Sequence, residues 1–349
     1  MPTSPDPAQC ELFFAATHGD GARESVALRR ASAHGDLVRL HRGAYVRSRD
    51  LSRLDARGRH VVLARAVVLG LSDACIVSHA SAAVLHGLPR VHATAPEVIS
   101  VIDPRRTTTS RSTHLFRRPG PGARGDDDSI CGVAVTGLER TAVDVARTSP
   151  LADAVLCLDA VLRRLVLPRG HETGPAAAAR LADVRARLLE RLGDGSRPGD
   201  RNARRALLFA SPWAENGGES LLRLALFELG VPDIELQRTF RVRGQFAGRC
   251  DAYSGSARVA VELDGFIKLT DAAMLAGRTP AEVVRDRDRR DRRLLECPDV
   301  RRVVHCEYRD LVQPARLAAL LIGAGVDLDP RRVTAAARAA AVRFAGGPR

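Results

Sequence analysis

Lysine is almost absent from this chain. Of the 54 Lys and Arg residues among its 349 residues, only Lys268 is a lysine. Arginine therefore serves at nearly every basic position. The single lysine indicates a site that needs a compact ammonium group, which a guanidinium group does not imitate. The alternative, that one lysine fell by chance on a solvated surface, is equally compatible with the composition alone.

Long apolar runs and cysteines spaced C-x-x-C are also lacking, and the first residues do not predict a signal peptide. The best apolar run, Val61 to Leu71, is interrupted by Arg65, so no membrane span is predicted. Residues 1–7 have neither the basic flank nor the apolar core of a signal peptide. The seven cysteines are odd in number and never spaced C-x-x-C, which argues against a zinc site and a disulfide framework. We therefore expect a cytoplasmic protein with reduced thiols.

The charge balance points to a polyanionic partner. The net charge is +13, while 45% hydrophobic and 27% charged residues are typical of a globular chain. A chain of this length is expected to hold two or three domains. Nucleic acid is the first candidate partner and a membrane surface the weaker one.

The first 50 residues predict a helix followed by a basic β-hairpin. Residues 24–33 have helical spacing, and two short strands at 37–40 and 44–47 flank a turn at 41–43. This is the element order of a winged helix-turn-helix. We expect the wing to contact DNA phosphates through Arg39, Arg42 and Arg47.

Three further regions follow before a change of pattern near residue 207. We predict an α/β unit over 51–145, then Ala-, Leu- and Arg-rich helices over 146–206 with a Gly- and Pro-containing linker at 193–199. Residues 207–325 alternate helix, strands, charged helix, strand and helix, which predicts a mixed sheet flanked by helices. Residues 326–349 are rich in Ala and Arg and form either a terminal helix or a basic tail.

The strands and the helix expected in residues 207–325 bring several acidic side chains to one place. Strands are expected at 249–253 and 257–264, and alternation puts Glu262 and Asp264 on one face. If residues 254–257 form the turn, Asp251 lies opposite Ala260 and diagonal to Glu262, roughly 7–8 Å away at Cα. Glu219 lies at the end of the apolar stripe of the preceding helix, which must pack on the same sheet.

Such a cluster is costly to bury unless a cation neutralises it. Mg²⁺ or Mn²⁺ would do so, because hard divalent cations take oxygen ligands. Lys268 could then orient an attacking water or steady a phosphate. The bland alternative is that Glu262 pairs with Lys268 on the surface while Asp251 and Asp264 belong to turns. The Arg/Asp run at 285–293 is either a solvated face or, through Arg285, Arg289 and Arg293, a phosphate-binding stripe beside the cluster.

The C-terminal residues resemble a known family. Glu219, Asp251, Glu262-Leu-Asp264-Gly265, the charged run 285–293 and the run 302–311 together resemble the endonuclease-like domains related to very-short-patch repair endonucleases. Those domains belong to the restriction-endonuclease-like PD-(D/E)XK superfamily. The resemblance implies a metal-dependent nuclease with Asp251 and Glu262 as metal ligands and Glu219 as a supporting acid. The usual superfamily lysine is Asp264 here, and relatives with E-x-D-G often carry histidine where this chain has Lys268.

The N-terminal residues resemble a second family. The runs 37–46, 78–88 and 135–144 are similar to abortive-infection type IV (AbiEi-like) antitoxins. The resemblance implies DNA binding by a winged helix, with helix 24–33 in the major groove. Two interpretations stay open for the whole chain, an α/β (α+β) multidomain protein. One is a DNA-binding, metal-dependent endonuclease of repair or phage defence. The other is a DNA-binding regulator or antitoxin, with a cognate toxin or defence partner and an inert nuclease-like domain.

Overall fold

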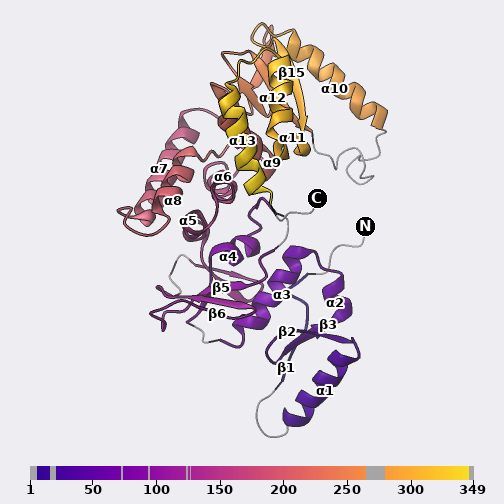
Figure 1. Ribbon diagram of the computed structural model, residues 1–349, viewed down its shortest axis with the longest axis vertical. Helices are drawn as coiled ribbons and strands as arrows, with labels where there is room; N and C mark the ends of the chain where they lie inside the picture. The colour runs from indigo at the N-terminus through magenta and orange to yellow at the C-terminus, as the bar shows by residue number, and fades with distance from the viewer. Residues whose placement is uncertain are drawn as a thin grey trace. The chain divides into compact units, whose positions relative to one another are not determined.

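The computed structural model describes residues 6–15, 21–71, 74–92, 95–122, 125, 127–264 and 280–345. The protein is a mixed α/β chain with several mixed and antiparallel sheets (Figure 1). It forms two compact units, residues 1–157 with 185–208, and residues 158–184 with 209–349.

The first unit contains two sheets. Three helices, α6 (Leu151–Val166), α7 (Pro175–Leu192) and α8 (Asp200–Phe209), contribute residues to both units. The other elements of the first unit, in chain order, are β1 (Leu12–Phe14), α1 (Gly21–Ala33), β2 (Leu37–His41), β3 (Ala44–Arg47), α2 (Ser48–Ser52), α3 (Ala56–Val68), β4 (Ile76–Val77), α4 (His79–Leu85), β5 (Ile99–Ile102), β6 (Ser110–Arg111), β7 (Leu115–Arg118), β8 (Asp128–Ile130), β9 (Val133–Val135) and α5 (Leu138–Thr148).

The N-terminal sheet has the strand order β1-β3-β2 and is antiparallel throughout. Its buried side chains, among them Leu40 and Val46, form one core cluster with Val62 and Ala66 of α3. The predicted 1–50 region therefore shares its apolar core with the first helix of the region predicted to follow it.

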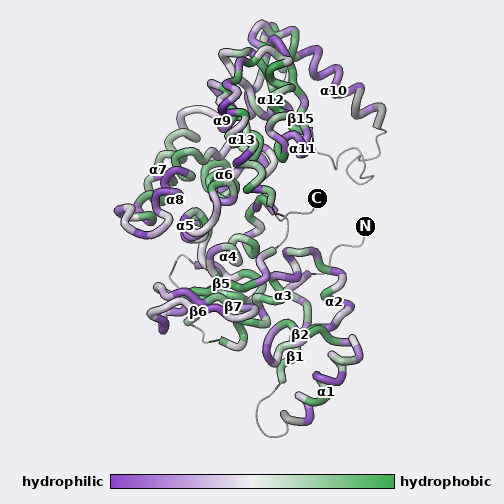
Figure 2. The backbone as a smooth tube through the Cα atoms, viewed as in Figure 1, coloured by the Kyte–Doolittle hydropathy of each residue, from purple (hydrophilic) through white to green (hydrophobic). Residues whose placement is uncertain are grey.

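The second sheet has the order β6-β7-β5-β4-β9-β8. It is mixed, because β5 runs parallel to β7 and β4 parallel to β9, while its other pairs are antiparallel. All four residues of β5 are buried, as expected for a central strand covered on both faces. Its green tube contrasts with the purple stretches at the edge near β6 (Figure 2).

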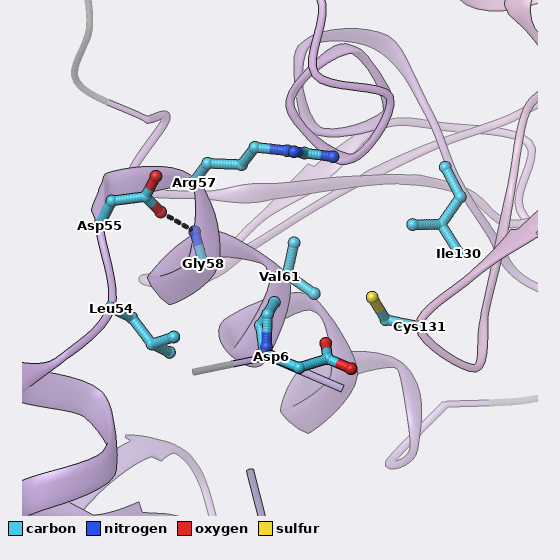
Figure 3. A pocket seen from close by; sticks show the side chains of 9 residues that line it. Asp6, Leu54, Asp55, Arg57, Gly58, Val61, Ile130 and Cys131 are labelled. Carbon is cyan, nitrogen blue, oxygen red and sulfur yellow. Dashed lines mark hydrogen bonds between the residues drawn. The ribbon is translucent and has the colours of Figure 1, made fainter. Parts of the chain in front are cut away.

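Helix α3 begins at a capped residue beside a hollow. Asp55 occupies the N-cap, and its side chain accepts a hydrogen bond from the Gly58 N–H at 2.7 Å (Figure 3). The hollow has a volume of about 310 Å³, and the side chains of Val61, Ile130 and Cys131 line part of it. Its lining combines apolar side chains and one half-buried thiol with the charged residues Asp6, Asp55 and Arg57.

The second unit is built around the sheet β10-β13-β14-β15, with a separate β11–β12 hairpin. Its elements, in chain order, are α9 (Gly217–Leu229), β10 (Ile234–Leu236), β11 (Thr239–Val242), β12 (Gln245–Arg249), β13 (Ala252–Ser254), β14 (Val259–Asp264), α10 (Pro280–Leu295), β15 (Arg302–Glu307), α11 (Tyr308–Val312), α12 (Pro314–Gly323) and α13 (Pro330–Arg343).

Helix α9 is the central helix of this unit. Asn216 caps its first turn, and Gly230 ends it with a left-handed φ of 82°. Figure 1 shows α13 beside α9 and α12, and both pairs are in contact. Of the two alternatives for the C-terminal Ala/Arg-rich region, residues 330–343 therefore form the helix, with Ala336 and Ala340 buried.

The apolar character of the helices and the state of the cysteines can be compared with the sequence analysis. Among the described ranges, no helix combines the length and the apolar character needed to cross a membrane. All seven cysteines are free thiols, and six of them are buried.

Candidate active site

The acidic residues meet where β13 and β14 pair, although in a different register from the predicted one. Tyr253 pairs with Ala260, and the four-residue turn is 255–258, with Arg258 at a left-handed φ of 54°. Extending this register by one residue puts Asp251 directly opposite Glu262. The predicted diagonal placement, with Asp251 opposite Ala260, is therefore wrong by two residues. The turn begins one residue later than the pattern of small residues indicates.

The predicted strand 249–253 is also wrong, because it is split in two. Arg249 ends β12 in the hairpin with β11, whereas Ala252 begins β13 in the larger sheet. The chain bends at Asp251 between them. Gly248 permits a close approach here, since a Cβ at this position would lie 2.8 Å from Cδ2 of Leu294. The bend frees the Asp251 carboxylate to accept a hydrogen bond from the Leu263 N–H at 2.9 Å.

Glu219 and Asp251 share one hydrogen-bond donor. The Gln237 side-chain amide donates to Oε2 of Glu219 at 2.8 Å and to Oδ1 of Asp251 at 3.3 Å. Glu219 is 5% exposed and also accepts hydrogen bonds from the Glu215 N–H and the Asn216 amide, each at 2.7 Å. Burial, together with the charge of Asp251, raises the pKa of Glu219 to about 7 against the lowering effect of the Glu215 N–H. Three hydrogen-bond donors thus occupy the two oxygens of Glu219.

Glu262 is buried, 5% exposed, and only half satisfied. Nη2 of Arg290 donates to its Oε2 at 3.1 Å, whereas its Oε1 has no hydrogen-bond partner among the described residues. Burial raises its pKa to about 7; Arg290 lowers the pKa and Asp251 raises it. A buried, unpartnered carboxylate oxygen opposite a second carboxylate is a costly arrangement that a cation would stabilise.

Asp264 belongs to a separate network on the same sheet edge. Its Oδ2 lies 2.7 Å from Nη1 of Arg287 and 3.2 Å from Nδ1 of His305. Burial acts to raise the pKa of Asp264, but His305 and the arginines Arg287 and Arg290 lower it below its ordinary value. Nε2 of His305 lies 2.8 Å from Oδ2 of Asp291, and its two carboxylate neighbours raise the pKa of His305 in spite of burial. His305 is thus an imidazole held between two acids.

Helix α10, mostly purple in Figure 2, turns part of its charged surface to the sheet. Arg287, Arg290 and Asp291 reach the carboxylates and His305. The predicted stripe of Arg285, Arg289 and Arg293 is exposed instead. Because Leu294 must be buried, the helix rotates the residues three and four before it toward the sheet. The phosphate contact expected of this stripe stays a prediction.

Two predicted features cannot be placed at this site. Lys268 and Gly265 lie outside the described residues. Within the part of the chain that the structure describes, no three His, Cys, Asp or Glu side chains are grouped closely enough to hold a metal ion.

The predicted basic wing divides into two parts. Arg39 and Arg42 are exposed on the β2–β3 hairpin. Arg47 instead pairs with Glu11 at 2.8 Å and lies over the ring of Phe13, 5.1 Å from its centroid.

Five side chains at the site escaped the sequence analysis: Gln237, Arg287, Arg290, Asp291 and His305. The alternation of β15 could have revealed His305, because Val304 and Cys306 are buried on the other face. Glu262 is its partner in the parallel β14–β15 register. No local signal marks Gln237, which lies between two strands and has a left-handed φ of 54°.

Comparison of the whole chain with known protein families, curated proteins and solved structures gives no match.

Proposed function

We propose that the protein is a DNA-binding, metal-dependent endonuclease whose active site lies at the bend between β12 and β13 and the end of β14. One observation carries the proposal. Asp251 and Glu262 stand opposite each other, and Oε1 of the buried Glu262 has no partner among the described residues. The sequence likeness to very-short-patch-repair-type nucleases points to the same two residues.

The donor chemistry of this pair suits a hard divalent cation. Asp251 and Glu262 would hold Mg²⁺ or Mn²⁺ through carboxylate oxygens, which are the ligands these ions prefer. When bound, the cation supplies Lewis-acid activation of a phosphodiester and of water. Glu219 suits a ligand role less well, because three hydrogen bonds already occupy its oxygens. Waters and substrate oxygens would complete the coordination.

The remaining residues of the site would orient Asp251, hold or transfer a proton and supply positive charge. Gln237 and the Leu263 N–H fix the two oxygens of Asp251. His305, which pairs with Asp264 and Asp291, would hold or transfer a proton near the scissile phosphate. Lys268 keeps the role that the sequence predicts for it, a compact cation near the attacking water or phosphate.

DNA binding is assigned to the first unit. The β1-β3-β2 sheet with α1 supports a winged-helix arrangement, and Arg39 and Arg42 are available on its hairpin. Phosphate contacts by these arginines would position the chain on DNA without reading its sequence.

A second function is favoured by the ion pairs at the site. Arg290 neutralises Glu262, and Arg287 neutralises Asp264, which occupies the position of the superfamily's usual lysine. Arginine thus supplies, at two of the four acids, the positive charge that a metal would otherwise provide. The alternative is a DNA-binding regulator or type IV antitoxin-like protein with an inert nuclease-like domain and a cognate toxin partner.

A nicking assay separates the two functions. The endonuclease proposal predicts that purified protein converts supercoiled plasmid to the open circle with Mg²⁺ or Mn²⁺ and not with EDTA. Glu262→Gln should abolish the conversion. Glu235→Gln, which removes a carboxylate from an exposed pair with Arg238, should cleave like wild type. Plasmid that stays supercoiled with both metals, while the protein still binds it, would favour the regulator.

A further inference from the structure

The segment 104–118 is the most cationic stretch of the first unit that the proposed function leaves unused. It contains no acidic residue and six serine or threonine hydroxyls. It runs from the end of β5 through the β6–β7 hairpin. Its basic residues are Arg105, Arg106, Arg111, His114, Arg117 and Arg118.

This hairpin forms one wall of an open hollow of about 500 Å³. Ser112, Thr113 and His114 line it from the β6–β7 turn, and the opposite wall is the β2–β3 hairpin. Its residues on that wall are Arg39, Leu40, His41 and Arg42. The described lining thus contains two arginines, two histidines and two hydroxyls, and no carboxylate.

We propose that this hollow binds consecutive backbone phosphates of duplex DNA, so that the DNA-binding surface continues from the β2–β3 hairpin onto the β6–β7 hairpin. The inference rests on the proposed DNA binding by the first unit and adds a second element to it. Guanidinium, imidazolium and hydroxyl groups are the side-chain donors that hold phosphate oxygens at protein–DNA interfaces. None of them reads a base here, so the contact sets register and affinity.

The surrounding charges leave the hollow positive. Asp103, on the segment leading into the hairpin, is shared between Arg106 at 3.9 Å and Arg117 at 3.6 Å. Arg39 and Arg42 have no ion pair with a described acidic residue, whereas Arg47 on the next strand is paired with Glu11. The two hairpins therefore present unneutralised arginines on one side of the hollow and histidine with hydroxyls on the other.

The two histidines make the contact sensitive to pH. Their ring centroids are 6.2 Å apart at an interplanar angle of 80°. Burial lowers the pKa of His41, and the charges of His114, Arg39 and Arg117 lower it further. A bound phosphate opposes this lowering of the pKa, because it favours the protonated imidazole of His41. Proton uptake on binding means that DNA affinity rises as pH falls.

The test is fluorescence anisotropy of a labelled duplex with the full chain in EDTA, at about pH 6 and about pH 8, where histidine changes its charge. His114→Asn should weaken binding about tenfold at the lower pH, the effect of losing one charge-assisted hydrogen bond. His41→Asn should flatten the pH dependence, because it removes the histidine whose pKa is lowered in the hollow. Ser112→Ala with Thr113→Val should weaken binding at both pH values. His171→Asn, in the other unit, is the matched control and should behave like wild type.

The outcomes separate this inference from the proposed function. Arg42→Ala lowering affinity and salt slope while His114→Asn changes neither would mean that the β2–β3 hairpin binds DNA and the hollow does not. No binding of duplex by wild type would overturn both. Tight calorimetric binding of inorganic phosphate that His114→Asn removes, with unchanged DNA affinity, would make the hollow a free-anion site and overturn the DNA assignment.

Discussion

Arg290 donates to one oxygen of Glu262 at 3.1 Å and leaves the other buried without a partner among the described residues. The guanidinium thus satisfies half of the carboxylate. Asp251 stands at the strand position opposite Glu262. The pair of Glu262 and Arg290 fits two interpretations. In the first, arginine neutralises an acid of an inactive nuclease-like site. In the second, Glu262 is a metal ligand with a single cationic neighbour.

Removing Arg290 distinguishes these interpretations. If Asp251 and Glu262 hold a cation, Arg290→Gln removes a competing positive charge and should tighten Mn²⁺ binding about tenfold, the equivalent of one pKa unit. Isothermal titration of the full chain with Mn²⁺ measures this. Arg289→Gln removes the same charge from the exposed face of α10, where Arg289 pairs with Asp286, and should change little. Equal Mn²⁺ affinities for the two variants would contradict the metal site.

A buried ion pair fixes α9 within the second unit. Nη2 of Arg223 lies 2.9 Å from both oxygens of Asp159, which also accepts from the Ser211 N–H. Asp159→Ala leaves a buried guanidinium uncompensated and should lower the free energy of unfolding by about 3–5 kcal/mol.

Denaturant unfolding followed by tryptophan fluorescence measures the free energy of unfolding of the second unit. Trp213 is the one tryptophan of the chain and belongs to the second unit, where its Nε1 donates to the Glu172 carbonyl at 3.1 Å. Glu235→Ala breaks the exposed pair with Arg238 and should cost less than about 1 kcal/mol. A loss of that small size for Asp159→Ala would show that the Arg223 charge finds other partners.

Asp144 gives the first unit a stability that depends on pH. Burial raises the pKa of Asp144 to about 6, although Arg140, Arg147 and Arg118 oppose the shift. A folded pKa above the unfolded value means that the protonated form stabilises the fold. That stability is complete below about pH 4 and is lost as pH rises through about 6.

Asp144→Asn should remove this dependence. The variant is expected to exceed wild type by roughly 2–3 kcal/mol at about pH 8, and to match it near pH 4. Hydrogen exchange of α5 and β9 peptides measures the difference within the unit. Asp36→Asn, at an exposed position of the same unit, is the control. An Asn variant that is less stable than wild type at the higher pH would mean that the carboxylate works as an ion-pair partner.

Much of the local structure could be predicted from periodicity. The strand and the helix expected after the charged helix of residues 207–325 are present as β15 and α12. Helix α9 has its end where Gly230 supplies the left-handed residue. These elements are set by short-range patterns, which a single sequence contains.

The geometry of the site depends on longer-range terms. The register of β14 with β13 differs by two residues from the predicted one, because Arg258 takes a left-handed conformation in the turn. Arginine is not one of the residues that predict such a turn from sequence. The rotation of α10 is set by the burial of Leu294 against the β12 region.

The prediction for Lys268 stands untested, because that residue lies outside the described ranges. We expect Lys268→Arg to slow cleavage by at least about 10²-fold, the low end for a positioned acid–base group.

Single-turnover cleavage of a labelled duplex by Asp251→Asn tests the central claim most directly. Asparagine keeps the size of the side chain and its hydrogen bond from the Leu263 N–H, and removes the charge opposite Glu262. We predict that wild type cleaves with Mg²⁺, that Asp251→Asn does not, and that both bind the duplex with equal affinity. Cleavage by Asp251→Asn at the wild-type rate would contradict the account.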